Sequence, residues 1–354
     1  MRAMVLHGHG DIDQYTLHED WPTPVAGEME VVIKVAACGM NNTDINTRSG
    51  WYSKAVTEAT TGGAYAEVSD DDPTWGGAPI SFPRIQGADV VGHVAAVGEG
   101  VPEAWLGKRV MTNGWLRDWS DPTNIDKTGY FGSECDGGFA EYTKTDVRCV
   151  AEVNSAYSDA ELATFSCSYC TAEGMLSRAN VDHNDTVLIP GASGGVGGAL
   201  VQLAKLRGAR LIGIAQSHKH AEVLALGADR LIDRNAENLK ALLADERITV
   251  VADVVGGANW GKLIDLLVRG GRYTCSGAIA GPMVQLDLRT FYLRDLTFTG
   301  STVNDVDVFP RVVRYIEQGK LKPVLAATYP LAELGAAQQA FIAKTHTGNL
   351  VIEP

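Results

Sequence analysis

The stretch Val187-Leu-Ile-Pro-Gly-Ala-Ser-Gly-Gly-Val-Gly-Gly198 is an apolar run that ends abruptly in glycines and continues into a helix-forming segment over 199–205. This pattern predicts a buried strand, a tight turn and the start of a helix. Gly194, Gly195 and Gly197 let the backbone approach a pyrophosphate, and the free N–H groups at the helix start would bind its negative charge. The stretch therefore predicts a dinucleotide-binding unit for a nicotinamide cofactor.

The segments after this turn repeat the strand and helix pattern. Short apolar runs occur at 210–215, 230–233, 250–255 and 271–275, and a helical pattern covers 218–227. Such alternation predicts a parallel sheet that helices cover on both faces. A glycine turn by itself also occurs where a strand merely packs close to a helix, so this repetition is what favours cofactor binding.

The chain of 354 residues is long for one hydrophobic core and suits two domains. Its first 150 residues contain short alternating strands between Gly and Pro turns, for example 31–37 and 90–97, which predict a β-rich, partly barrel-like domain. The tail after 304 predicts two helices and a closing strand that pack back on this domain. The segment 53–83 is either an excursion near the active-site mouth or a solvated insertion without a role.

Charge and hydropathy limit the partners. The net charge of −13 argues against nucleic acid or an anionic membrane surface as a partner. No apolar run reaches 18 residues, and the N-terminus lacks the apolar region of a signal peptide. The six cysteines are scattered, so reduced thiols are the default. We expect a cytoplasmic protein that acts on a small molecule.

Four segments carry a family resemblance, and they are listed here: Asn41-Asn-Thr-Asp-Ile-Asn-Thr-Arg-Ser-Gly-Trp-Tyr52, Gly87-Ala-Asp-Val-Val-Gly-His-Val94, Ala192-Ser-Gly-Gly-Val-Gly197, and Asp253-Val-Val-Gly-Gly257 with Ser276-Gly277. Nearly the whole chain resembles the medium-chain dehydrogenase/reductase superfamily, in its zinc-independent quinone oxidoreductase-like and enoyl reductase-like branch. The resemblance implies an α/β fold with a doubly wound parallel Rossmann sheet over 154–304. A GroES-like catalytic domain would comprise 1–153 together with 305–354.

The alcohol dehydrogenases that this chain resembles hold a catalytic zinc through a Cys, a His and a second Cys or Glu. Asn41 and Asn42 stand at the first Cys and His positions, so only Asp89 and Cys167 remain as ligands. We therefore expect no metal. The pair Cys167 and Cys170, with Cys38, also fits buried structural cysteines better than a thiol cluster, because a lone Cys-x-x-Cys is weak evidence.

The end of the second strand predicts the choice of cofactor. Sheets that select NAD carry an acidic residue there, whereas this chain has Ala215 followed by Gln216. Ser217 and Lys219 can donate to a 2′-phosphate, so NADPH is favoured, with Arg234 as a helper. Lys219 would otherwise be a solvent-facing lysine. The full set of expected cofactor-binding residues is Thr171, Ala192, Ser193, Gly194, Gly195, Val196, Gly197, Ser217, Lys219, Val255, Gly256, Ser276 and Gly277.

Without zinc, the reaction needs a hydride delivered to an electron-poor carbon and a group that stabilises the resulting oxyanion or enolate. We expect Asn41 to hydrogen-bond the substrate oxygen. By resemblance Tyr52 donates a proton, or else it is a wall residue beside Trp51. Asp44 orients the cofactor amide or a water, or else caps a helix that begins near 45.

The predicted function is NADPH-dependent reduction of quinones or α,β-unsaturated carbonyls. Two alternatives stay open: an alcohol or polyol dehydrogenase with a metal site rebuilt around Cys167 and Asp89, and a cofactor-binding protein without turnover. By resemblance, the protein forms a homodimer or homotetramer through an edge strand near 296–301.

Overall fold

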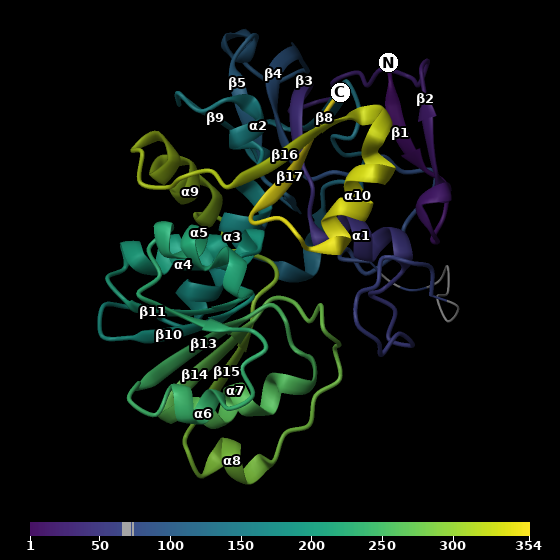
Figure 1. Ribbon diagram of the computed structural model, residues 1–354. Helices are drawn as coiled ribbons and strands as arrows, with labels where there is room; N and C mark the ends of the chain where they lie inside the picture. The colour runs from purple at the N-terminus through teal and green to yellow at the C-terminus, as the bar shows by residue number, and fades with distance from the viewer. Residues whose placement is uncertain (66–71, 73) are drawn as a thin grey trace.

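The structure is a computed structural model, which describes residues 1–65, 72 and 74–354. Figure 1 shows two β-sheets, one in the lower half of the molecule and one in the upper half, with helices between and around them. The lower sheet is parallel throughout and has the order β12-β11-β10-β13-β14-β15. Its strands are β10 (Thr186–Pro190), β11 (Arg210–Ala215), β12 (Arg230–Asp233), β13 (Ile248–Asp253), β14 (Leu267–Cys275) and β15 (Thr297–Gly300).

Strand β10 shows why its sequence is apolar at every position. Val187 and Ile189 belong to a core with helices on one face, whereas Leu188 belongs to a separate core on the other face. Side chains of a strand alternate between faces, so a strand buried on both faces needs a continuous apolar run. The predicted doubly wound parallel sheet is confirmed. The helices of this region are α3 (Ser166–Arg178), α4 (Gly195–Leu206), α5 (His220–Ala225), α6 (Leu239–Leu242), α7 (Trp260–Leu266) and α8 (Leu288–Tyr292).

The upper sheet joins the first part of the chain to its last part. Its order is β16-β17-β3-β4-β5-β9, and β8 pairs with β3 outside this path. C-terminal strand β17 (Asn349–Glu353) pairs antiparallel with β3 (Glu30–Gly39). The remaining strands are β4 (Asp89–Val97), β5 (Arg109–Thr112), β8 (Tyr142–Asp146), β9 (Val150–Glu152) and β16 (Leu325–Pro330). The tail therefore returns to the β-rich region, while the domain limits 1–153 with 305–354 and 154–304 stay a prediction.

Smaller elements complete the structure. Two two-stranded pairs are β1 (Ala3–Leu6) with β2 (Tyr15–His18), and β6 (Trp115–Arg117) with β7 (Thr128–Tyr130). The helices outside the parallel sheet are α1 (Asn42–Ser49), α2 (Asp159–Leu162), α9 (Val308–Glu317) and α10 (Leu334–Ala343). Within the described ranges, no helix is long and apolar enough to cross a membrane.

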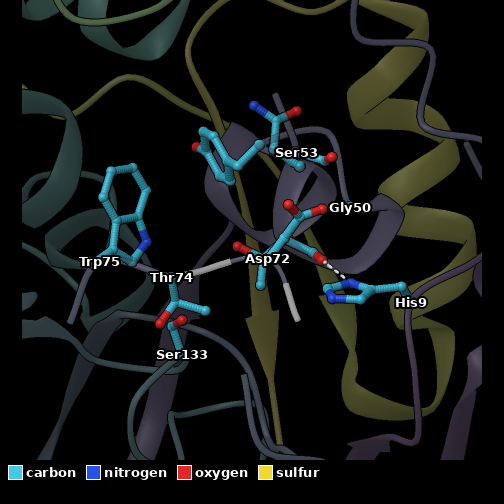
Figure 2. Close-up of a pocket in the computed structure, with 10 residues that line it drawn as sticks. His9, Gly50, Ser53, Asp72, Thr74, Trp75 and Ser133 are labelled. Atoms are coloured by element: carbon cyan, nitrogen blue, oxygen red, sulfur yellow. Dashed lines mark hydrogen bonds between the residues drawn. The ribbon is translucent and has the colours of Figure 1, made fainter. Parts of the chain in front are cut away.

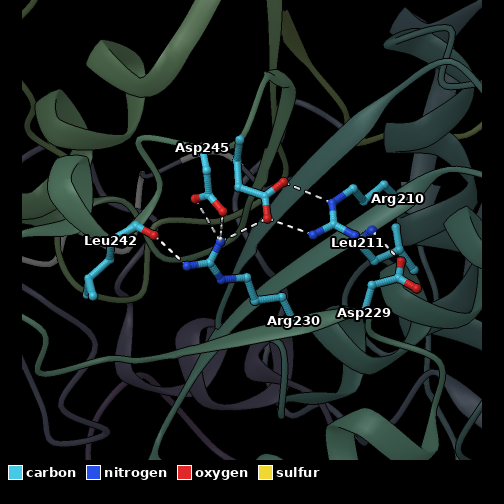
Figure 3. Close-up of polar contacts among 7 residues, drawn as sticks. Arg210, Leu211, Asp229, Arg230, Leu242 and Asp245 are labelled. Carbon is cyan, nitrogen blue, oxygen red and sulfur yellow. Dashed lines mark hydrogen bonds and ion pairs between the residues drawn. The ribbon is translucent and has the colours of Figure 1, made fainter.

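An ion-pair network ties together the first residues of β11 and β12 (Figure 3). Arg210 donates twice to Glu246, at 2.9 and 2.7 Å, and Arg230 donates to Glu246 at 2.9 Å and to Asp245 at 3.0 Å. Hydrogen bonds from Arg210 lower the pKa of Glu246 to about 2. Networked, bidentate pairs of this kind hold geometry better than isolated surface pairs. They lie at the sheet edge opposite the strand ends that form the site.

Candidate active site

A cavity of about 990 Å³ lies where the carboxyl ends of the parallel strands face the β-rich region. Ligands of open α/β sheets bind at this edge. Most of the predicted site residues line the cavity: Asn41, Tyr52, Thr171, Ser193, Gly194, Gly195, Val196, Gly197, Lys219, Val255, Gly256, Ser276 and Gly277. Asp44, Ala192 and Ser217 are not part of the lining.

The glycine turn reaches the cavity through its backbone. Helix α4 begins at Gly195, and Gly194 is its N-cap residue. A Cβ atom on Gly197 would lie 2.1 Å from the carbonyl oxygen of Gly191, so only glycine fits there. The first amides of α4 therefore remain open to an anion. Ala192 is fully buried beneath this turn, so its predicted contact with the cofactor is corrected to a packing role.

The loop after β13 is shaped by a buried carboxylate. The Oδ1 atom of Asp253 accepts hydrogen bonds from the amides of Val255, at 2.7 Å, and Gly256, at 3.3 Å. Gly256 adopts a φ of 62°, in the left-handed region that favours glycine. Asp253 thus positions the backbone that lines the cavity, a role that the sequence analysis did not assign.

The cavity has a basic end formed by Lys219, Arg234, Lys344 and His346. No Asp or Glu occurs among the described residues of the lining, although the whole chain has a net charge of −13. Lys219 is only 4% exposed, so it is not a solvent-facing lysine. Its Nζ donates to the carbonyl oxygens of Lys344 at 2.7 Å and His346 at 2.5 Å.

Ser217 requires a correction. It is exposed, and its hydroxyl and amide both donate to the carboxylate of Asp233, the last residue of β12. These bonds lower the pKa of Asp233 and engage the donors of Ser217. Ser217 therefore does not present a free donor to the cavity.

Lys344 and His346 were missed because they lie far along the chain from the glycine turn. The amide of Gly348 donates to the carbonyl oxygen of Ser193 at 3.0 Å, which holds the C-terminal loop against the turn. Burial and nearby Lys219 lower the pKa of Lys344 to about 7, and burial with both lysines lowers that of His346 to about 4. In the sequence, the only signal was two basic residues before the closing strand.

Asn41, Asp89 and Cys167 meet beside the cavity, and Lys344 of the basic end reaches toward them, because its Nζ donates to the side-chain oxygen of Asn42 at 3.1 Å. The Nδ2 atom of Asn41 donates to Asp89 at 3.0 Å, and the amide of Cys167 donates to the second oxygen of Asp89 at 2.9 Å. Burial raises the pKa of Asp89 to about 7. The amide of Asn41 keeps a second N–H for a ligand.

Asp44 holds Asn41 from behind. Its Oδ2 accepts a hydrogen bond from the backbone N–H of Asn41 at 2.7 Å. The third residue of a helix commonly caps the N-cap residue in this way. Asp44 is 5% exposed, and burial raises its pKa to about 7. Asp44 therefore caps α1, as in the second of the two roles predicted for it, and it positions Asn41 without being part of the cavity lining.

Tyr52 belongs to an aromatic end of the cavity, which consists of Trp51, Tyr52, Trp75, Trp115 and Tyr130. Helix α1 ends at Ser49, and its C-cap residue Gly50 adopts the left-handed conformation that turns the chain into Trp51 and Tyr52. Desolvation raises the pKa of Tyr52, so its phenol is protonated at neutral pH. The ring centroids of Tyr52 and Trp75 are 4.9 Å apart.

The excursion 53–83 reaches this site. Trp75 lines the cavity, and the amide of Thr60 donates to the carbonyl oxygen of Ile279, which also lines it, at 3.0 Å. A smaller pocket of about 210 Å³ shares Tyr52 and Trp75 with the cavity, and Figure 2 shows Trp75 and His9 on opposite sides of it. The acidic run 70–73 lies outside the described residues except for Asp72.

Comparisons with known proteins agree with this architecture. The family models "Alcohol dehydrogenase GroES-like domain" and "Zinc-binding dehydrogenase" match residues 27–155 and 195–318. A solved structure from Sinorhizobium meliloti, provisionally described as an alcohol dehydrogenase, is 42% identical, with a TM-score of 0.90; the match covers 100% of this chain and 96% of that one. The chain belongs to the medium-chain dehydrogenase/reductase superfamily.

Two curated relatives place this superfamily member in the quinone oxidoreductase-like branch. Acryloyl-coenzyme A reductase of Metallosphaera sedula is 28% identical, over 99% of each chain. Human quinone oxidoreductase is 26% identical, over 99% of this chain and 97% of its own. The predicted superfamily, branch and fold class, with a parallel Rossmann sheet and a GroES-like domain, are confirmed.

The name of the second family model, "Zinc-binding dehydrogenase", implies a zinc ion. The side chains at the expected ligand positions of this superfamily member do not fit a zinc ion. Asn41 offers an amide, and both oxygens of Asp89 already accept hydrogen bonds from Asn41 and Cys167. In the described part of the chain, no three His, Cys, Asp or Glu side chains gather where they could hold a metal ion.

Proposed function

We propose that this protein is an NADPH-dependent oxidoreductase that reduces quinones or α,β-unsaturated carbonyls by hydride transfer without catalytic zinc. The observation that carries the proposal is one cavity in which the glycine turn and a carboxylate-free basic end lie together with the amide of Asn41 and the phenol of Tyr52. The names of the relatives, quinone oxidoreductase and acryloyl-coenzyme A reductase, support this class of reaction.

The residues present fit a nicotinamide dinucleotide. The amides of Gly195 to Gly197 would bind the pyrophosphate, and Lys219, Arg234 and Lys344 would surround the 2′-phosphate that distinguishes NADPH from NADH. An acidic residue at the end of β11 would repel that phosphate, and Ala215 stands there instead. When bound, the cofactor supplies a hydride from its nicotinamide ring.

On the substrate, the free N–H of Asn41 would donate to the carbonyl oxygen. This bond stabilises the negative charge that develops there when hydride adds to the β-carbon. The electron pair of the C=C bond moves toward the oxygen, and the α-carbon of the resulting enolate takes the proton of Tyr52. Water then returns a proton to the tyrosinate, so the phenol is restored.

The test is NADPH oxidation by the chelator-treated protein with a 1,4-quinone and with a simple enone as acceptors. Turnover with either acceptor, unchanged by the chelator, is the expected result. If the protein oxidises alcohols only after zinc is added, it is a dehydrogenase with a rebuilt metal site. If it binds NADPH without transferring hydride to any acceptor, it is a cofactor-binding protein.

We also propose a homodimer through the free edge of β15. This strand ends the parallel sheet, and apolar side chains in the segment that precedes it in the chain are exposed, among them Met283 at 69% and Leu288 at 65%. An open strand edge next to an exposed apolar patch favours pairing with a second copy. Light scattering of the purified protein should give twice the mass of the chain.

The free cysteines suit a reducing compartment, so we propose that the protein acts in the cytoplasm.

A further inference from the structure

The aromatic end is a slot made of rings that stand on edge to one another. The ring centroids of Trp75 lie 5.8 Å from Trp115 at an interplanar angle of 86°, and 5.9 Å from Tyr130 at 52°. Trp115 and Tyr130 lie 5.1 Å apart at 68°. These contacts pack the rings into one cluster, and Tyr52 and Trp75 are its more exposed members, so their faces are the ones that a flat guest can reach from the cavity.

Three segments far apart in the sequence supply these rings. Tyr52 follows α1, Trp75 belongs to the excursion, and Trp115 and Tyr130 are directly paired across β6 and β7. Trp115 and Tyr130 are each 7% exposed. The excursion and the β6–β7 pair therefore help to form the cavity, because both contribute aromatic side chains to its lining.

The hydroxyl of Tyr130 is the buried polar group of this slot. It has no nitrogen or oxygen partner among the described residues, and its neighbour is the thiol of Cys167, which is a weak hydrogen-bond partner. Its pKa is raised by burial first and then by Cys167 and Asp89, so the hydroxyl faces the cluster of Asn41, Asp89 and Cys167. Because a thiol is a weaker acceptor than a carbonyl oxygen, a ligand carbonyl would satisfy this buried hydroxyl better than Cys167 does.

We propose that the aromatic end binds the flat ring of an aryl-substituted enone, and that the Tyr130 hydroxyl donates a hydrogen bond to the carbonyl oxygen of this acceptor. The inference rests on the proposed function, since it names the acceptor of the same reaction. Hydride adds to the β-carbon, the C=C electron pair moves onto the carbonyl oxygen, and the α-carbon takes its proton from Tyr52. Tyr130 keeps its own proton and stabilises the enolate together with Asn41.

The experiment compares two enones, 4-phenyl-3-buten-2-one and 3-buten-2-one, with the full-length protein and NADPH. In Trp75→Leu, kcat/KM for the aryl enone should fall about 30-fold, and that for the small enone by less than about threefold. Trp105→Leu, which removes a tryptophan outside the cavity, is the matched control and should change neither value. Equal losses for both enones in Trp75→Leu would overturn the ring-binding role.

Tyr130→Phe keeps the ring and removes only the hydroxyl. We expect kcat for both enones to fall about 100-fold, the magnitude typical of one oxyanion donor. The melting temperature should change little, because the Cys167 thiol is only a weak partner for the lost hydroxyl. Tyr169→Phe is the contrast, because its hydroxyl bonds to Gln202 at 2.6 Å and to the carbonyl oxygen of Lys322 at 2.8 Å. That variant should melt earlier with kcat unchanged, whereas an unchanged kcat in Tyr130→Phe would overturn the donor role.

A binding measurement separates this inference from the proposed function. The saturated ketone 4-phenyl-2-butanone cannot accept hydride at carbon–carbon bonds, and it should quench the tryptophan fluorescence of the NADP⁺ complex. Quenching that is lost in Trp75→Leu and kept in Trp105→Leu supports the aromatic slot even if no enone is reduced. Reduction of 3-buten-2-one without any preference for, or binding of, the aryl compounds overturns the inference and leaves the proposed function standing.

Discussion

The glycine turn would bind a ligand through the first backbone amides of α4, and Lys219, Arg234 and Lys344 of the basic end line the same cavity. At the aromatic end, the lining consists of side chains that three separate segments bring together. The first arrangement is local, because a strand, a turn and a helix follow one another in the chain. The second arrangement is assembled only when the excursion and the β6–β7 pair pack against α1. A dinucleotide-binding site can thus be recognised as a motif in the sequence, whereas the site for the hydride acceptor cannot.

The largest effect should come from Gly197→Ala, which tests whether cofactor binding depends on the backbone geometry of the glycine turn. The added Cβ would lie 2.1 Å from the carbonyl oxygen of Gly191, so the turn must open. We expect cofactor affinity to fall more than about 100-fold, since several amide contacts are lost together. Isothermal titration with NADP⁺ measures it. Gly261→Ala, at a helix position where nothing lies within 4 Å, should bind as wild type; a normal affinity in Gly197→Ala would contradict the assignment.

Tyr52→Phe tests whether Tyr52, at the aromatic end, donates a proton to the substrate or only lines the cavity. Loss of the phenol should lower kcat on enones about 100-fold, near the lower limit for general acid catalysis, with the NADPH Kd unchanged. Steady-state kinetics provide the measurement. Tyr292→Phe removes a hydroxyl from a side chain that is 60% exposed and should have no effect. Full turnover in Tyr52→Phe across pH would leave it as a wall residue beside Trp51.

Lys219→Glu reverses one charge at the basic end. Replacing a charged hydrogen-bond donor with a carboxylate should lower the ratio of NADPH to NADH efficiency about 30-fold, since such bonds contribute about 1.5–3 kcal/mol. The readout is kcat/KM for each cofactor with the same acceptor. Lys240→Glu makes the same charge change at an exposed position outside the cavity and serves as the control. An unchanged ratio would show that Lys219 does not contact the 2′-phosphate.

The smallest effect concerns pH and Lys344. Its pKa of about 7 means that the free protein loses this charge as pH rises, while a bound phosphate would restore it. Binding above pH 7 therefore requires proton uptake, and NADP⁺ affinity should fall about fivefold between pH 7 and pH 8. His346, with a pKa of about 4, stays neutral over this range. Titration calorimetry in Lys344→Met should show weaker binding without this slope; a slope equal to wild type would point to another group.

Much of the fold followed from local pattern. The run Val187 to Ile189 predicted a strand buried on both faces, and the glycines after it predicted the helix start that the structure shows. The lining positions Asn41, Tyr52 and Thr171 came from resemblance at matching motifs, and the structure brings them into one cavity. Ser217 was misjudged because its hydrogen-bond partner, Asp233, belongs to a different strand.

By itself, the sequence determined the parallel sheet, the glycine turn and the absence of an acid after β11, because each depends on neighbours a few residues apart. Only the tertiary structure decided that Lys344 joins Lys219, that Asp89 is engaged by Asn41 and Cys167, and that Trp75 meets Trp115 and Tyr130. These contacts join segments distant in the chain, and their burial is what shifts the pKa values of Lys344 and Asp89. Burial depends on how the whole chain packs, so no local pattern encodes it.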